Sequence, residues 1–86
     1  MRRRVGGITV FVAPGVADGS RVAFIANRSV GSAVVRNRAK RRLREAFARV
    51  PIRVGHDYVV IATSVVAEAP FEDLVGWLAR AVTEEE

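Results

Sequence analysis

The chain has 86 residues, half of them hydrophobic, with no cysteine and a formal net charge of +5. This length supports one domain, and the apolar fraction is too high for a disordered basic tail. The lack of cysteine excludes a disulfide framework and a cysteine-based zinc site. No apolar run reaches the roughly 18 residues of a membrane span. We expect one domain over residues 1–86, cytoplasmic and not associated with a membrane.

The charge is distributed unevenly along the chain. Residues 1–56 carry thirteen of the fourteen basic residues and two acids, Asp18 and Glu45. Residues 57–86 carry one basic residue and seven acids. Such asymmetry is typical of a protein with a polyanionic partner. A protein that is merely soluble and basic is the alternative, and the concentration of charge in one half argues against it.

Two strands are predicted near the N-terminus. Residues 8–13 are β-branched and aromatic and end at Pro14, and residues 21–26 have the same character. Residues 16–20 have the composition of a turn, so we expect the two strands to pair as an antiparallel hairpin. Residues 1–7 are expected to form a basic N-terminal end.

A helix is predicted over residues 33–49, where hydrophobic residues recur with a period close to 3.6. Ser32 fits its N-cap position, and Pro51 ends it. Its apolar stripe consists of Val35, Ala39, Leu43, Ala46, Phe47 and Val50. Beside this stripe lie seven cations: Arg36, Arg38, Lys40, Arg41, Arg42, Arg44 and Arg49.

The C-terminal third predicts one more strand and one more helix. Residues 57–63 are a near-continuous apolar run, as expected of a strand that is buried on both faces. The last helix is expected to begin at Pro70, with Glu72 and Asp73 favouring its dipole. The acidic tail, residues 83–86, opposes that dipole and should fray. The order is β-β-α-β-α, which predicts an α/β protein built as an α+β two-layer sandwich of a small sheet with two helices.

The sequence contains no recognisable catalytic constellation. His56 is the only histidine; it stands beside Asp57 in a turn, where a hydrogen bond to its neighbour is a commoner role than catalysis. No serine has the context of a nucleophile elbow. The basic half contains no pair of acids that could hold a metal. A stand-alone nuclease is therefore the least favoured hypothesis.

The basic side of the predicted helix is the best candidate for a functional surface. Guanidinium groups pair bidentately with phosphates and stack on bases. The amide of Asn37, at the centre of this side, can hydrogen-bond a base edge or a ribose hydroxyl. A solvated helix face normally includes acids for i,i+4 pairs, but Glu45 is the only acid in this helix. These features predict binding to nucleic acid.

Residues 30–47 carry a resemblance to a known family. They read Val-Gly-Ser-Ala-Val-Val-Arg-Asn-Arg-Ala-Lys-Arg-Arg-Leu-Arg-Glu-Ala-Phe. This run, with its Arg-Asn-Arg core followed by Lys and Arg, is similar to the helix signature of the bacterial ribonuclease P protein component. The Arg-Val-Ala-Phe of residues 21–24 and the strand at residues 57–62 also resemble that family. The resemblance covers residues 8–82.

The resemblance implies an RNA-binding subunit of ribonuclease P, the endonuclease that removes the 5′ leader from precursor tRNA during tRNA processing. In that ribonucleoprotein the RNA subunit holds the Mg²⁺ ions and cleaves, so no catalytic residue, metal or cofactor is expected on the protein alone. The fold that it implies has a left-handed β-α-β crossover, an exception to the usual handedness. A structural RNA-binding protein of the ribosomal type, without a role in tRNA processing, is the alternative. The implied contacts with ribonuclease P RNA are Arg36, Asn37, Arg38, Lys40, Arg41 and Arg44.

The resemblance also implies a cleft for the single-stranded leader. Phe11 falls on the sheet wall of this cleft and Arg28 at its edge; core packing is the alternative role for Phe11. An aromatic ring stacks on any base with roughly 1–3 kcal/mol, which suits leaders of different sequence.

The other wall of the cleft is usually a helix that precedes the first strand. Residues 1–7 are too short for that helix. We therefore expect a truncated or engineered chain, a natural short form, or a sheet covered by another subunit. An uncovered apolar strip would also favour self-association. The arginines of residues 2–4 are expected to contact phosphates nonspecifically or to form a disordered end.

Overall fold

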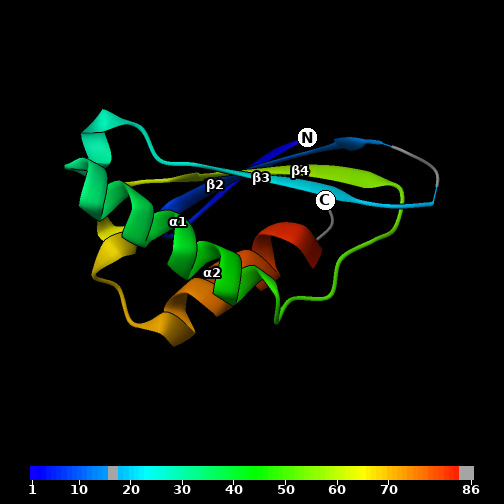
Figure 1. Ribbon diagram of the computed structural model, residues 1–86. Helices are drawn as coiled ribbons and strands as arrows, with labels where there is room; N and C mark the ends of the chain where they lie inside the picture. Colours follow the sequence, from blue (N-terminus) through cyan, green and yellow to red (C-terminus); the bar gives the residue numbers. More distant parts are fainter. Residues whose placement is uncertain (16–17, 84–86) are drawn as a thin grey trace.

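The computed structural model describes residues 1–15 and 18–83. One mixed sheet is covered on one face by two helices (Figure 1), which confirms the predicted two-layer α+β sandwich. Two residues of the predicted turn, 16 and 17, lie outside the described residues, as do residues 84–86 of the predicted frayed tail 83–86, whereas Thr83 is helical. The elements are the strands β1 (Arg2–Val5), β2 (Ile8–Pro14), β3 (Arg21–Ile25) and β4 (His56–Ala62), the helices α1 (Ala33–Phe47) and α2 (Phe71–Thr83), and the short 3₁₀ helices η1 (Arg28–Val30) and η2 (Ser64–Ala67).

The strands lie in the order β1-β2-β4-β3, with β3 and β4 parallel and the other two pairs antiparallel. The predicted hairpin between residues 8–13 and 21–26 is therefore wrong, because β4 lies between β2 and β3. The prediction of a strand buried on both faces is also wrong for β4. Its alternate residues are buried, but Val59 and Ile61 are half-buried because the helices cover only one face.

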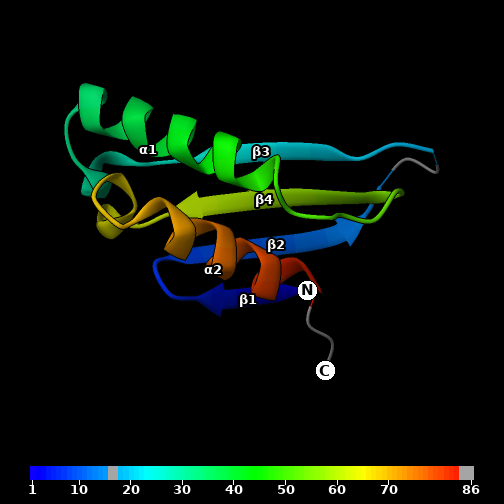
Figure 2. The ribbon, with the colours of Figure 1, turned by 90° about the horizontal axis from the view of Figure 1, so that it is seen from below.

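The connection from β3 through α1 to β4 is a left-handed crossover. Figure 2 shows the helices in front of the sheet, with β3 and β4 running in one direction and α1 running back between them. In that view β3 lies above β4 and both strands run to the left; when the view is turned so that the strands point upward, the chain moves from β3 on the right to β4 on the left. This is the handedness that the family resemblance implied, and it is rare in parallel β-α-β units.

The helices bury their apolar faces against β2, β3 and β4. The ring of Phe47 on α1 meets Phe24 and Tyr58 edge-on, at centroid distances of 5.8 and 5.7 Å. The buried Tyr58 hydroxyl accepts a hydrogen bond from the Arg53 amide at 3.1 Å, so this polar atom has a partner within the core. Five of the six residues of the predicted apolar stripe are buried, and Val35 is half-buried.

The starts of both helices and the end of α1 follow their sequence signals closely. The Ser32 hydroxyl accepts a hydrogen bond from the Val35 amide at 3.4 Å, which confirms the predicted N-cap. Helix α1 ends at Phe47, two residues before the predicted end, in a tight turn that leads to Pro51. Pro70 precedes α2, and its carbonyl accepts from the Leu74 amide.

The arginine-rich N-terminal segment is a strand, not a disordered end. β1 pairs with β2 so that Val5 lies opposite Ile8, and both side chains are buried under α2. The turn between these strands is Gly6-Gly7. Gly6 has a φ of 54°, and a Cβ atom there would lie 2.2 Å from the indole of Trp77 on α2. Glycine therefore lets the turn close directly onto the helix.

Two glycines in contrasting environments give a stability prediction. Gly76 is exposed within α2, and a Cβ atom there would meet no atom within 4 Å. Gly76→Ala should therefore raise the free energy of unfolding by about 0.5–1 kcal/mol. Gly6→Ala should lower it by at least about 1 kcal/mol because of the left-handed backbone and the contact with Trp77. Urea denaturation of both variants measures this, and a neutral Gly6→Ala would contradict the close packing of the turn.

Candidate RNA interface

The outward side of α1 is a polar surface whose residues differ in exposure. Arg36, Lys40 and Arg44 follow one another at intervals of four, so they form one row along the helix. The guanidinium of Arg44 lies 5.6 Å from the ring centroid of Phe24, which places this row on the β3 side. The side chains predicted to bind RNA include four exposed ones, Asn37, Arg38, Arg41 and Arg44, and two half-buried ones, Arg36 and Lys40.

Arg42 does not belong to this surface, although the sequence places it among the same seven cations. Its guanidinium donates to the carbonyl oxygens of Val66 at 2.6 Å and Ala69 at 2.5 Å. These bonds join the middle of α1 to η2 and to the start of the segment that leads to α2. Arg49, in the turn that follows α1, also makes a contact, since its guanidinium lies 5.1 Å from the ring centroid of Phe71. The structure thus gives Arg42 and Arg49 contacts within the fold.

Arg28 lies close to the N-terminal end of α1. It is exposed in η1, the short helix between β3 and α1. Asn27 caps η1 by accepting from the Ser29 amide at 3.0 Å, and the Arg28 carbonyl accepts from the Gly31 amide. At the same end the Arg36 guanidinium donates to the Gly31 carbonyl at 2.9 Å. The chain therefore holds Arg28 and Arg36 at one end of the sheet.

The second candidate surface is the sheet face away from the helices, which we call the open face. Among its residues is Phe11, which is 40% exposed and does not contribute to the core. Core packing, the alternative role for Phe11, is therefore wrong. Register and alternation place these residues on the open face: Arg2, Arg4, Thr9, Phe11, Ala13, Arg21, Ala23, Ile25, Asp57, Val59 and Ile61.

An ion pair crosses one end of the open face. The Arg21 guanidinium donates to both carboxylate oxygens of Asp57, at 2.7 and 3.3 Å. The hydrogen bond from Arg21 holds the pKa of Asp57 below its usual range. Among the described residues of the open face Asp57 is the one acid, and Arg21 neutralises it. The predicted hydrogen bond between His56 and its neighbour is not made by His56 Nδ1, which has no partner.

Within residues 1–15 and 18–83, no three histidine, aspartate or glutamate side chains gather as metal ligands would. None of the helices in this part of the chain is both long and apolar enough to cross a bilayer. The fold and its surfaces define a small α+β protein with a polycationic helix beside an exposed, partly apolar sheet face. This is the class of protein that binds a polyanion.

Comparison with known proteins identifies the family. Residues 2–85 match the family model described as Ribonuclease P. The chain is 51% identical over 73 residues to the ribonuclease P protein component of Ruegeria pomeroyi and 46% identical over 70 residues to that of Chloroflexus aggregans. These matches cover 79% and 78% of this chain but 58% and 52% of the relatives, so the chain spans little more than half of their length. The chain belongs to the ribonuclease P protein family.

A solved structure supports the same assignment. The ribonuclease P protein from Thermotoga maritima superposes with a TM-score of 0.85 and 26% identity, covering all of this chain and 84% of that one. The α+β fold, with its four-stranded mixed sheet and two helices, is thus that of ribonuclease P proteins.

Three features of the surfaces could not be found from the sequence. The structural role of Arg42 was missed, because its partners are backbone carbonyls 24 and 27 residues away. The placement of Arg2 and Arg4 on the open face was missed because three consecutive arginines give no alternating strand signal. A hollow that forms between the β1–β2 turn and η2, about 500 Å³ in volume, was also missed. Its walls come from four different segments of the chain.

Proposed function

We propose that this chain is the RNA-binding part of a bacterial ribonuclease P protein component, working in the cytoplasm. The exposed polar side of α1 carries this proposal, because Arg38 and Arg41 are exposed there to phosphates, whereas the Arg42 guanidinium is bonded to two backbone carbonyls. Its partner would be ribonuclease P RNA, and precursor tRNA would be the substrate of the assembled ribonucleoprotein. The contacts with the RNA subunit are assigned to Arg36, Asn37, Arg38, Lys40, Arg41 and Arg44.

The open face would hold the single-stranded 5′ leader. Phe11 offers an exposed ring on which a base can stack, and Val59, its neighbour across the strands, extends the apolar surface. Arg28, at the edge near α1, would contact a leader phosphate. The same apolar surface would allow self-association when no RNA covers it.

Cleavage itself is assigned to the RNA subunit with its Mg²⁺ ions. The protein would hold the RNA and the leader in position and lower the electrostatic repulsion between the two polyanions. This division of labour agrees with a surface built from arginines and an exposed aromatic ring.

Reconstitution tests the proposal. The chain is added to bacterial ribonuclease P RNA and a precursor tRNA at low Mg²⁺, and 5′ cleavage is followed on a gel. We expect faster cleavage with the chain than with RNA alone. RNA binding without stimulation would instead support a ribosomal-type structural protein, and cleavage without the RNA subunit would support a nuclease.

A further inference from the structure

The strand β1 brings two arginines to its edge of the open face. Arg2 lies opposite Phe11 in the register, and Arg4 lies opposite Thr9. Across the sheet the same two rows continue through Val59 and Ile61 of β4. Each row therefore begins with a guanidinium at the sheet edge and reaches apolar side chains on the central strand.

Charge favours a polyanion on these rows. Arg2 and Arg4 are exposed, and neither has an ion-pair partner among the described residues. Side chains two residues apart on one strand are separated by about 6.6–6.8 Å, so each guanidinium can reach a separate phosphate. Since Arg21 neutralises Asp57, no free carboxylate on the described part of this face opposes an anion.

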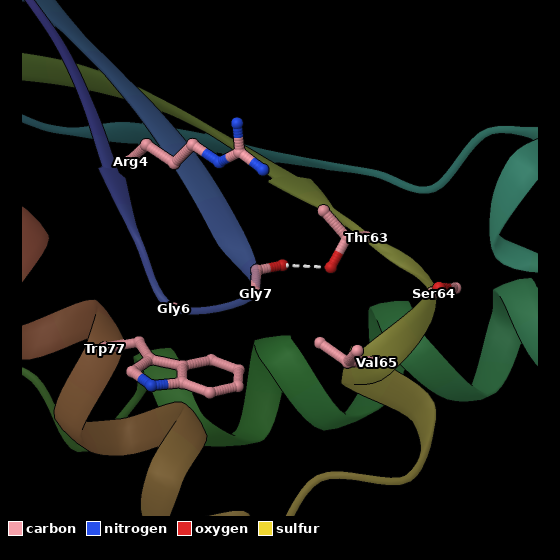
Figure 3. Close-up of a pocket in the computed structure, with 7 residues that line it drawn as sticks. All are labelled: Arg4, Gly6, Gly7, Thr63, Ser64, Val65 and Trp77. Atoms are coloured by element: carbon pink, nitrogen blue, oxygen red, sulfur yellow. Dashed lines mark hydrogen bonds between the residues drawn. The ribbon is translucent and has the colours of Figure 1, made fainter.

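The row of Arg4 leads into the hollow at the end of the sheet. Figure 3 shows Arg4 and Trp77 on opposite sides of the Gly6-Gly7 turn, with Thr63 and Ser64 approaching from the end of β4. The Thr63 hydroxyl donates to the Gly7 carbonyl at 2.7 Å and holds the turn against β4. The hollow is open to solvent and has a volume of about 500 Å³, so a ligand can enter it from the surface.

The lining of the hollow combines the groups that a nucleotide needs. The Arg4 guanidinium offers donors to a phosphate, and the exposed Ser64 hydroxyl offers a hydrogen bond to a base or ribose. The indole of Trp77 and the exposed side chain of Val65 supply an apolar wall for the base.

We propose that the β1 edge and this hollow bind single-stranded RNA, with phosphates on Arg2 and Arg4 and one nucleotide in the hollow beside Trp77. The inference rests on the proposed function in taking RNA as the partner. It goes further by assigning RNA contacts to β1, which forms the edge of the sheet opposite β3 and α1. A strand of RNA on this face would then lie between Arg2 and Arg4 on one side and the cations of α1 on the other, with its bases over Phe11.

Trp77 is the only tryptophan of the chain, so its fluorescence reports on the hollow directly. The probe is a fluorescein-labelled octauridylate, whose binding to the whole chain is followed by anisotropy. Emission of Trp77 is recorded with the unlabelled oligonucleotide in the same buffer. We expect a saturable change in Trp77 emission with the same midpoint as the anisotropy.

The double variant Arg2→Ala/Arg4→Ala should weaken octauridylate binding about tenfold or more. Its log–log salt dependence should be shallower by about 1.4, as expected when two phosphates of a single strand are no longer neutralised. Arg49→Ala, which removes one positive charge on the helix side, is the control and should change the affinity less than twofold. Ser64→Ala should reduce the Trp77 response while leaving the salt dependence unchanged.

Three results would overturn this inference, the first two of which concern RNA binding. The first is an unchanged Trp77 emission at saturating octauridylate. The second is an equal loss of affinity in the β1 double variant and in Arg49→Ala. Concentration-dependent dimerisation that disappears in the β1 double variant would also overturn it, by showing that a second copy occupies this edge instead. Failure of the proposed function is distinguishable from failure of this inference. In that case the chain would not stimulate 5′ cleavage in the reconstitution assay, whatever the result of the octauridylate titration.

Discussion

Alanine at both Arg38 and Arg41 is expected to weaken binding to ribonuclease P RNA about 100-fold while leaving the fold intact. Both side chains are exposed on α1, and loss of a charge-assisted hydrogen bond costs about 1.5 kcal/mol or more, which is close to tenfold for each residue. The log–log salt dependence should become shallower by about 0.7–0.9 for each phosphate that is no longer neutralised. Filter binding at several salt concentrations measures both quantities.

The stability of this double variant is its internal control. Exposed substitutions away from special features change the free energy of unfolding by about 0.5 kcal/mol or less. A weaker affinity with an unchanged salt dependence would show that these arginines do not touch phosphates, and the assignment of the α1 surface would then fail. Asn37→Ala should leave the salt dependence unchanged, because it removes hydrogen bonds but no charge.

Arg42→Met is expected to give the opposite pattern, a loss of stability with little change in the salt dependence of RNA binding. Methionine keeps much of the apolar stem but leaves the carbonyls of Val66 and Ala69 without their donor. An unsatisfied buried acceptor costs about 1–3 kcal/mol. For a domain of this size, each kcal/mol lowers the melting temperature by roughly 4–8 °C.

Arg41→Met is the matched control for that experiment, since Arg41 is the adjacent residue and is exposed. Thermal unfolding followed by circular dichroism should separate the two variants by several degrees. If Arg42→Met had the same melting temperature as Arg41→Met and the same loss of RNA affinity, Arg42 would be an RNA contact and not a structural link. Two neighbouring arginines thus have separable roles.

Local signals in the sequence were sufficient to predict the helices and their faces. The apolar stripe of α1, the Ser32 cap and the clustered cations are short-range properties, and they predicted both the helix and its exposed basic surface. The strands 8–13 and 21–26 were also found where predicted, within one residue or so. The pairing of these two strands was not predicted, because contacts across the whole sheet decide that β4 lies between them.

The strand β1 shows why the N-terminal part of the sheet and the residues of its open face could not be predicted from the sequence. Arginine has no particular preference for strands, and what places Arg2–Val5 in the sheet is its register with β2 and the burial of Val5. The exposure of Phe11 depends in the same way on which face the helices cover. The family resemblance supplied the expectation that Phe11 lies on a cleft wall, which the residue pattern alone left open against core packing.

The central place of β4 has a consequence for biosynthesis. As the chain leaves the ribosome, β3 has no strand to pair with until residues 56–62 have also emerged, because β4 is its neighbour in the sheet. Helix α1 is complete by then, and its apolar stripe has no sheet to cover. During that interval the nascent chain presents a polycationic amphipathic helix close to ribosomal RNA. Completion of the sheet by β4 is therefore the step that buries the apolar stripe of this helix.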